Sequence, residues 1–202
     1  MNVYANFFVA IWLKFFFLLT PFFVMSVFLS MTPELSGRER RRLALKVTVA
    51  VLASCFTLFF FGNHLFSLFG ITIDSFRIGA GALLFLSAVQ MVQSDTSTAP
   101  GERSGDISVV PLAIPVTVGP ATTGALLVMG AELQGAWQTV TGCAALAAAV
   151  LCIGALLGSA AAIEHVIGKR GITILSKLTG LMLAALAAQI VFTGIKSFLA
   201  VK

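Results

Sequence analysis

Long apolar runs dominate this chain and constrain its fold more than any other feature. Six of them are long enough to cross a bilayer, which takes about 20 residues of α-helix. They cover residues 6–30, 43–62, 76–93, 108–131, 137–161 and 178–200. Backbone groups in hydrocarbon must be bonded within the protein, and the alternation of a membrane barrel is missing, so the runs are predicted to be helices. The sequence predicts an all-α integral membrane protein with a single membrane domain over residues 1–202.

The low content of charge argues against several other classes of protein. Only 10% of the residues are charged, whereas a soluble domain has about 25%. The net charge of +5 lies in short loops between apolar runs, so nucleic acid is not an expected partner. His64 and His165 lie near opposite predicted faces, and no Asp or Glu falls at mid-membrane, so neither an enzyme nor a metal or cofactor site is expected.

Basic residues are concentrated in alternate loops, which sets the predicted orientation. The loops after the first, third and fifth spans carry Arg38, Arg40, Arg41, Arg42, Arg103, Lys169, Arg170 and Lys177. Loops rich in Lys and Arg stay in the cytoplasm. The sequence therefore predicts a multi-pass protein of the inner membrane with both termini on the periplasmic side and a cytoplasmic linker at 94–107.

The chain matches itself in scattered places when it is shifted by 99 residues. Pro21 falls on Pro120, Gly81 on Gly180, and Gln90 on Gln189. Residues 1–93 and 108–202 then form two repeats of three spans each, and an odd number of spans inverts the second copy. Inverted repeats are typical of secondary transporters, which bind their substrates near the midplane where the repeats meet.

The fourth span is predicted to break near its centre. Pro111, Pro115 and Pro120 fall within ten residues, and Gly119 precedes the last of them. Proline removes a helical hydrogen bond and clashes with the preceding turn, but it suits the first turn of a new helix. A half-helix is therefore expected to begin at Pro120.

The first span also contains a proline near its centre, in the pair Thr20-Pro21, so a second half-helix is expected to begin at Pro21. The two half-helix N-termini are predicted to face each other at mid-bilayer, where their free N–H groups attract a carboxylate. The alternative is a pair of proline kinks whose threonines bond to their own backbone.

These features define a candidate substrate site between the two repeats. Its predicted residues are Thr20, Pro21, Phe22, Thr117, Gly119, Pro120, Ala121, Thr122, Thr123, Gln90 and Gln189. The two glutamines either face the cavity or join helices by hydrogen bonds. Lys14 is expected to extend toward the outer interface, and Asp74 to pair with Arg77 one turn later.

Several motifs resemble the MarC family of inner-membrane proteins, also known as UPF0056. They are the Pro-Leu-Ala-Ile-Pro stretch at 111–115 followed by Gly119-Pro120, together with the segments at 77–81, 168–171 and 178–181. Members are described as neutral amino-acid transporters or left without a function, and their three-helix repeats are similar to those of LysE-type exporters. The family usually carries Asn or Asp where this chain has Thr20, so the resemblance leaves substrate and coupling open at that position.

Repeats, breaks and resemblance together predict a secondary transporter that moves small neutral amino acids or similar solutes by alternating access. The expected partners are a small zwitterion and the lipid bilayer, with H⁺ or Na⁺ as a coupling ion and a homo-oligomer left open. The alternatives are an exporter or channel for another small solute or drug, and a membrane scaffold that transports nothing.

Overall fold

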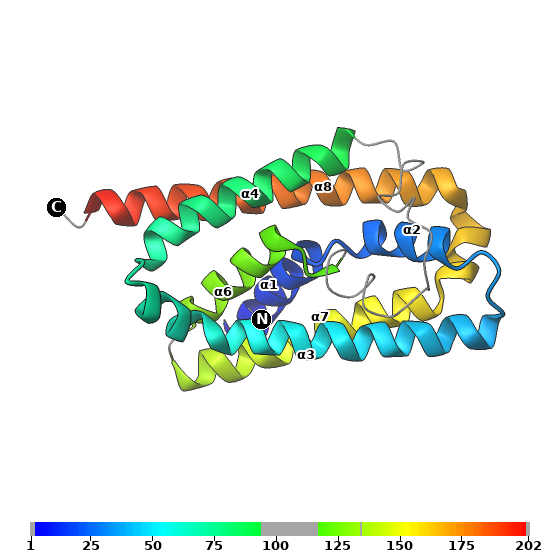
Figure 1. Cartoon of the computed structure of the whole chain (residues 1–202), viewed down its shortest axis with the longest axis horizontal. Coiled ribbons are helices and arrows are strands. Elements are labelled where there is room, and N and C mark those ends of the chain that lie inside the picture. Colours follow the sequence, from blue (N-terminus) through cyan, green and yellow to red (C-terminus); the bar gives the residue numbers. More distant parts are fainter. Residues whose placement is uncertain (1–2, 94–116, 134, 201–202) are drawn as a thin grey trace.

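Seven α-helices make up the part of the chain that the computed structural model describes, which is residues 3–93, 117–133 and 135–200. They are α1 (Val3–Leu18), α2 (Pro21–Met31), α3 (Gly37–Phe69), α4 (Ile73–Gln93), α6 (Pro120–Glu132), α7 (Ala136–Gly158) and α8 (Ala160–Ala200). These residues contain no β-strand. Figure 1 shows most of the helices running along the long axis of one elongated bundle, which confirms the predicted all-α fold.

Five helical stretches of the described residues are long and apolar enough to cross a membrane. They are Tyr4–Met31, Gly37–Gly62, Ile73–Gln93, Ala136–Gly158 and Ala160–Ala200. Large apolar side chains also cover the outside of the bundle, where Leu68 and Phe192 are exposed. Lipid rather than water suits such a surface, so the chain is an integral membrane protein. The remaining predicted span, the fourth, contributes α6, while its first part, 108–116, lies outside the described residues.

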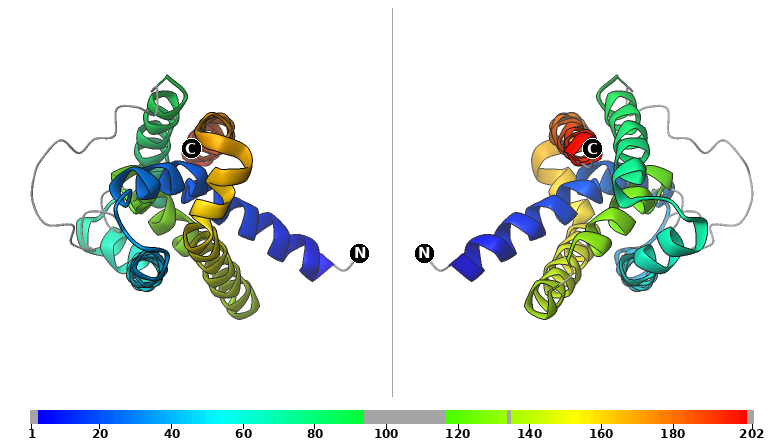
Figure 2. Two further views of the ribbon diagram at one scale, coloured as in Figure 1. Left: turned by 90° about the vertical axis from the view of Figure 1, so that its right-hand side faces the viewer. Right: turned by 90° about the vertical axis from the view of Figure 1, so that its left-hand side faces the viewer.

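The first span breaks at Thr20, as predicted. α1 ends at Leu18, Thr20 has left-handed dihedrals (φ 47°, ψ 58°), and Pro21 opens α2. Figure 2 shows that α1 leaves the bundle sideways whereas α2 lies within it. The break therefore changes the direction of the chain as well as interrupting the helix.

α6 begins in the predicted way, with Pro120 as its first residue and Gly119 as its N-cap. Figure 1 shows α2 and α6 starting near the middle of the long axis and running toward opposite ends of the bundle. The helix starts at the two prolines are thus confirmed. Their facing at mid-bilayer stays a prediction.

α3 is longer than the predicted span 43–62. It begins at Gly37 because Ser36 and Glu39 form a capping box, in which each side chain bonds the other residue's backbone N–H. It continues to Phe69 and ends where Gly70 takes φ 63°. The helix therefore extends beyond the predicted span at both ends. The charged and polar ends of the apolar run are helical too.

α8 also exceeds its predicted span, 178–200, because helix continues through the basic segment before it. Lys169, Arg170 and Lys177 lie on α8 rather than in a loop. Gly168 has φ 68° and bends the element, so that its first turns cross the end of the bundle before the long part runs back. Burial of Ile172 and Ser176 shows that this basic segment packs on one face.

α4 and α8 run side by side, and positions 99 residues apart exchange roles in their contact (Figure 1). A Cβ on Gly81 would lie 2.6 Å from Val191 and 3.1 Å from the carbonyl oxygen of Ala187. The corresponding distances from Gly180 are 2.9 Å to Val92 and 3.3 Å to the carbonyl oxygen of Ala88. A two-fold relation between the halves requires such reciprocity. The repeats themselves, 1–93 and 108–202, stay predictions, and the linker at 94–107 lies outside the described residues.

α6 is held against α3 almost backbone to backbone. A Cβ on Gly62 would lie 2.6 Å from the carbonyl oxygen of Leu127, and one on Gly130 would overlap that of Phe59. Behind this crossing lies the main core, which includes Phe15, Phe28 and Leu126. The glycines therefore allow α6 to pack closely against α3.

Candidate substrate cavity

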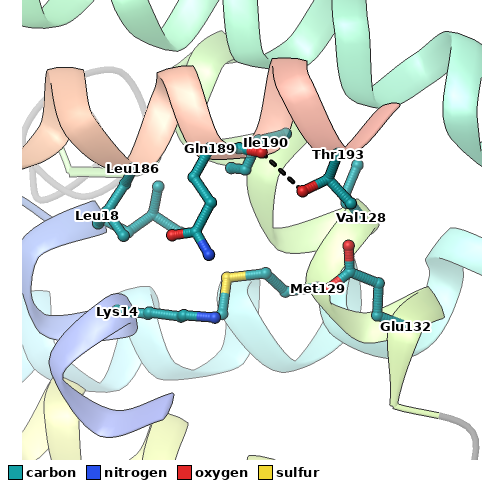
Figure 3. A pocket seen from close by; sticks show the side chains of 9 residues that line it. All are labelled: Lys14, Leu18, Val128, Met129, Glu132, Leu186, Gln189, Ile190 and Thr193. Atoms are coloured by element: carbon teal, nitrogen blue, oxygen red, sulfur yellow. Dashed lines mark hydrogen bonds between the residues drawn. The ribbon is translucent and has the colours of Figure 1, made fainter. Parts of the chain in front are cut away.

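A cavity of about 230 Å³ lies between α1, α6 and α8. Figure 3 shows its lining, which consists of Lys14, Leu18, Val128, Met129, Glu132, Leu186, Gln189, Ile190 and Thr193. Five of these side chains are apolar, and the remaining four are an ammonium, a carboxylate, a carboxamide and a hydroxyl. Groups of both charge signs therefore meet in one small space inside a largely apolar bundle.

Lys14 is the only charged residue in the span Tyr4–Met31. Its ammonium makes no hydrogen bond or ion pair with any described residue. Figure 3 shows the side chain extending toward Met129 instead of out along α1. The expectation that Lys14 extends to the outer interface is thus replaced by a place in the cavity. Charged side chains within spans are costly, and they usually face a bundle interior where they bind or pair.

Gln189 brings its amide into the same space from α8 (Figure 3). The amide has no hydrogen-bond partner among the described residues. Its backbone carbonyl accepts a bond of 2.7 Å from the Thr193 hydroxyl one turn later. Gln189 therefore lines this cavity and points its amide donor and acceptor into it, while its role in binding a substrate stays a prediction.

Glu132 lines the cavity at the end of α6 and is bonded by Arg77 of α4, which does not itself line the cavity. Nε and Nη2 of Arg77 both lie 2.9 Å from Oε1 of Glu132. The predicted pair between Arg77 and Asp74 is present as well. Arg77 is thus shared by two carboxylates, and the three residues together carry one negative charge.

The structure distributes the sequence-predicted site residues over several places. Gln189 lines the cavity described above, and Leu18, just before the break at Thr20 and Pro21, lies beside it. Pro120 and Thr123 line a second hollow of about 470 Å³ between α4 and α6. The remaining predicted residues line neither space among the described parts of the chain: Thr20, Pro21, Phe22, Thr117, Gly119, Ala121, Thr122 and Gln90.

The second hollow is almost entirely apolar. Its other lining residues are Ile71, Ser75, Phe76, Gly79, Ala80, Leu83, Gly124 and Leu127. Its described lining offers two hydroxyls, from Ser75 and Thr123, and no charge. Thr117 and Thr122, predicted to add donors, are buried. The described residues therefore gather charge at one of the two spaces only.

Sequence reasoning did not predict that Lys14 and Glu132 would line one cavity. The signal for Lys14 was present, because a lone lysine far inside an apolar span is rare. Glu132 lies at the predicted end of its span, where a carboxylate needs no special explanation. Lys14 and Glu132 line the same cavity because α1 leaves the bundle sideways. No periodicity in the sequence predicts that direction.

Comparison with known proteins identifies the family. The family model for the MarC family integral membrane proteins matches residues 5–199. The chain belongs to the MarC family. A UPF0056 membrane protein of Aquifex aeolicus is 31% identical, with 98% of this chain and 97% of the relative covered. UPF0056 membrane protein YhcE of Escherichia coli is also 31% identical, over 96% of this chain and 92% of its own.

Relatives of this MarC protein extend to archaea. A UPF0056 membrane protein of Methanocaldococcus jannaschii is 29% identical over 96% of this chain and 98% of its own length. The names of these relatives describe membrane proteins and give no substrate. No solved structure matches the chain.

Proposed function

We propose that this MarC protein is a secondary transporter that moves small neutral amino acids, or similar small zwitterions, across the inner membrane. The observation that carries the proposal is the cavity between α1, α6 and α8, where Lys14 and Glu132 bring opposite charges into an apolar bundle. A zwitterion brings the same two charges in a small molecule, so it suits this lining better than a simple cation or anion.

The charges define a direction across the cavity. Lys14 supplies a positive end on α1 and has no anion of its own among the described residues. At the other end Oε1 of Glu132 takes both bonds from Arg77, which leaves Oε2 without a bonded partner in the described chain. A bound amino acid would set its carboxylate on Lys14 and its ammonium near Glu132. The amide of Gln189 bonds either group.

The size of the cavity suits a small solute. Its volume of about 230 Å³ holds about seven water molecules at about 30 Å³ each, comparable with the non-hydrogen atoms of a small aliphatic amino acid. The apolar walls formed by Leu18, Val128 and Ile190 would receive an aliphatic side chain. Most drug-sized sites are larger, about 300–1,000 Å³, so bulky solutes are disfavoured.

Alternating access would follow from the motion of one half against the other. The reciprocal contacts of α4 and α8 support two inverted halves, and α2 and α6 run in opposite directions from the centre of the bundle. The arginines at the start of α3 favour a cytoplasmic location for that end. The C-terminus lies at the other end (Figure 1), and we propose that both termini are periplasmic. A coupling ion, H⁺ or Na⁺, would enter with the solute.

Thermal unfolding with three matched solutes tests the proposal. L-alanine carries both charges, propionate only the carboxylate, and ethylamine only the ammonium. L-alanine is expected to raise the unfolding temperature of the purified protein, because a ligand at about a hundredfold excess over its Kd stabilises by about 2.7 kcal/mol. Propionate and ethylamine are expected to have far smaller effects.

Lys14→Gln should abolish the shift, while Lys196→Gln, a change of an exposed lysine outside the cavity, should leave it intact. A panel of small neutral amino acids that gives no shift with the parent protein contradicts the proposal. Saturable uptake and counterflow in liposomes then separate a carrier from a channel, in which flux rises with concentration without exchange.

A further inference from the structure

Arg77 occupies a position from which it can control the proposed binding site. Its guanidinium is largely buried, with 16% of the side chain exposed. Nε and Nη2 bond Glu132 of α6, while Nη1 bonds Asp74 of its own helix. The contact with Glu132 is the ion pair that joins α4 to α6 in the described structure. It therefore links the first predicted half to the second at one end of the bundle.

α8 packs closely against α4 beside the pair of Arg77 and Glu132. A Cβ on Gly194 would lie 2.9 Å from the carbonyl oxygen of Asp74 and 3.0 Å from Cβ of Arg77. Only a glycine lets α8 approach α4 this closely. The pair of Arg77 and Glu132 is thus held between three helices, two of which, α6 and α8, also line the cavity.

Glu132 pairs with one cationic side chain and lines the same cavity as a second one. Arg77 holds it from α4, while Lys14 lies in the same cavity from α1 without an ion pair among the described residues. A ligand ammonium would compete with Arg77 for the same carboxylate. A group with alternative partners on different helices is a two-state element of the kind that a ligand can bias.

We propose that Arg77 and Glu132 form a gate over the cavity, which holds α4 against α6 and opens when Glu132 transfers from Arg77 to a cation inside. This inference deepens the proposed function, because it takes the cavity as the binding site. Arg77 acts here through Glu132 and is a positioning residue. The carboxylate of Asp74 pairs with Arg77 within one helix and does not itself bond the second half.

Access to a cysteine placed behind the gate tests the inference without any substrate. In a chain with Cys55, Cys143 and Cys152 replaced by Ala, Leu186→Cys puts a reporter in the cavity two turns of α8 deeper than Gly194. A membrane-impermeant thiol reagent is applied to vesicles of both orientations. A second reporter, Ile71→Cys in the exposed turn between α3 and α4, identifies the face on which the gate lies.

Arg77→Gln and Glu132→Gln are each expected to raise the labelling rate of the Leu186→Cys reporter at least about tenfold, and only from the face that labels Ile71→Cys. That ratio is the least expected for losing hydrogen bonds between charged groups. The double variant should add nothing to the single ones. Asp74→Asn is the matched control, since it removes a carboxylate from Arg77 but leaves α4 joined to α6.

Unchanged labelling in either folded variant overturns the gate, as does an equal rise with Asp74→Asn. If Arg77→Gln fails to fold, Glu132→Gln alone decides. The result is independent of the proposed function: a labelling rise without any amino-acid-induced stabilisation keeps the gate and rejects the solute class. Stabilisation by L-alanine with unchanged labelling keeps the solute class and rejects the gate.

Discussion

The two spaces beside α6 differ in chemistry although each lies next to one of the helix breaks. The cavity between α1, α6 and α8 adjoins the break at Thr20 and contains Lys14, Glu132 and Gln189. The hollow between α4 and α6 includes Pro120 itself and is almost entirely apolar. Among the described residues, charge therefore gathers beside only one of the two breaks. There the helix before the break, α1, leaves the bundle sideways and carries Lys14 into the cavity lining.

Reversal of the charge at Lys14 should have the largest effect on the difference between the two spaces. Lys14→Glu places a carboxylate opposite Glu132, so the cavity loses its positive end and repels a ligand carboxylate. Like charges or a lost charge partner cost about 2–5 kcal/mol in binding, so affinity for a small neutral amino acid should fall at least about thirtyfold. Isothermal titration of the purified protein measures it. Affinity within threefold of the parent would remove Lys14 from the site.

A substitution at the crossing of α3 and α6 should lower the free energy of unfolding more than one in the lining of the apolar hollow. Gly130→Ala places a methyl group against the carbonyl oxygen of Phe59, so α6 must move away from α3. Overpacking of this kind costs about 1–3 kcal/mol. Gly79→Ala is the matched control, because a Cβ there has nothing within 4 Å. Equilibrium unfolding in mixed micelles should separate the two variants, and equal stabilities would contradict the close crossing of α3 and α6.

Loss of one neutral polar group should weaken binding by less. Gln189→Leu keeps the approximate size of the side chain but removes the amide from the cavity, and a single hydrogen bond contributes about 0.5–1.5 kcal/mol. A threefold to tenfold loss of affinity follows. Thr123→Val makes a similar change in the apolar hollow and should leave affinity unaltered. A larger effect at Thr123 than at Gln189 would move the binding site to the hollow.

The smallest effect concerns the break beside the polar cavity. Thr20 has a left-handed conformation, which costs a residue with a Cβ about 1–2 kcal/mol and which Asn tolerates better. Thr20→Asn should therefore stabilise the protein by about 0.5–1 kcal/mol in the same unfolding measurement. Gly119, the matching residue before Pro120, is extended at φ −74° and ψ 175°. Asn there should bring no such gain, so a gain at both positions would refute the conformational explanation.

The breaks and most of the spans could be read from the sequence because their causes are local. Proline fixes the start of a helix wherever it lies, and Pro21 and Pro120 begin α2 and α6 as expected. Apolar runs located the membrane segments. The ends of α3 and α8 were misjudged because charged residues continue a helix into the interface as readily as they form a loop, and Lys169 and Arg170 do so.

The cavity itself was beyond local reasoning. The sequence places Lys14 inside the first apolar span, but the neighbours of its side chain depend on the direction of α1 before the break, which tertiary packing sets. The ion-pair partner of Glu132 could not be predicted either, because Arg77 lies 55 positions earlier on another helix. Gln189 was found because the repeat at an offset of 99 singled it out. The same repeat gave equal weight to Gln90, which lines neither space among the described residues.

Protection of cysteines by ligand tests most directly which space binds the solute. In the chain without native cysteines, Thr193→Cys reports on the polar cavity and Thr123→Cys on the apolar hollow. Each variant is labelled with a small thiol reagent, with and without the small neutral amino acid that most raises the unfolding temperature. The account predicts that the amino acid slows labelling at position 193 and leaves the rate at 123 unchanged. Protection at 123 with none at 193 would contradict it.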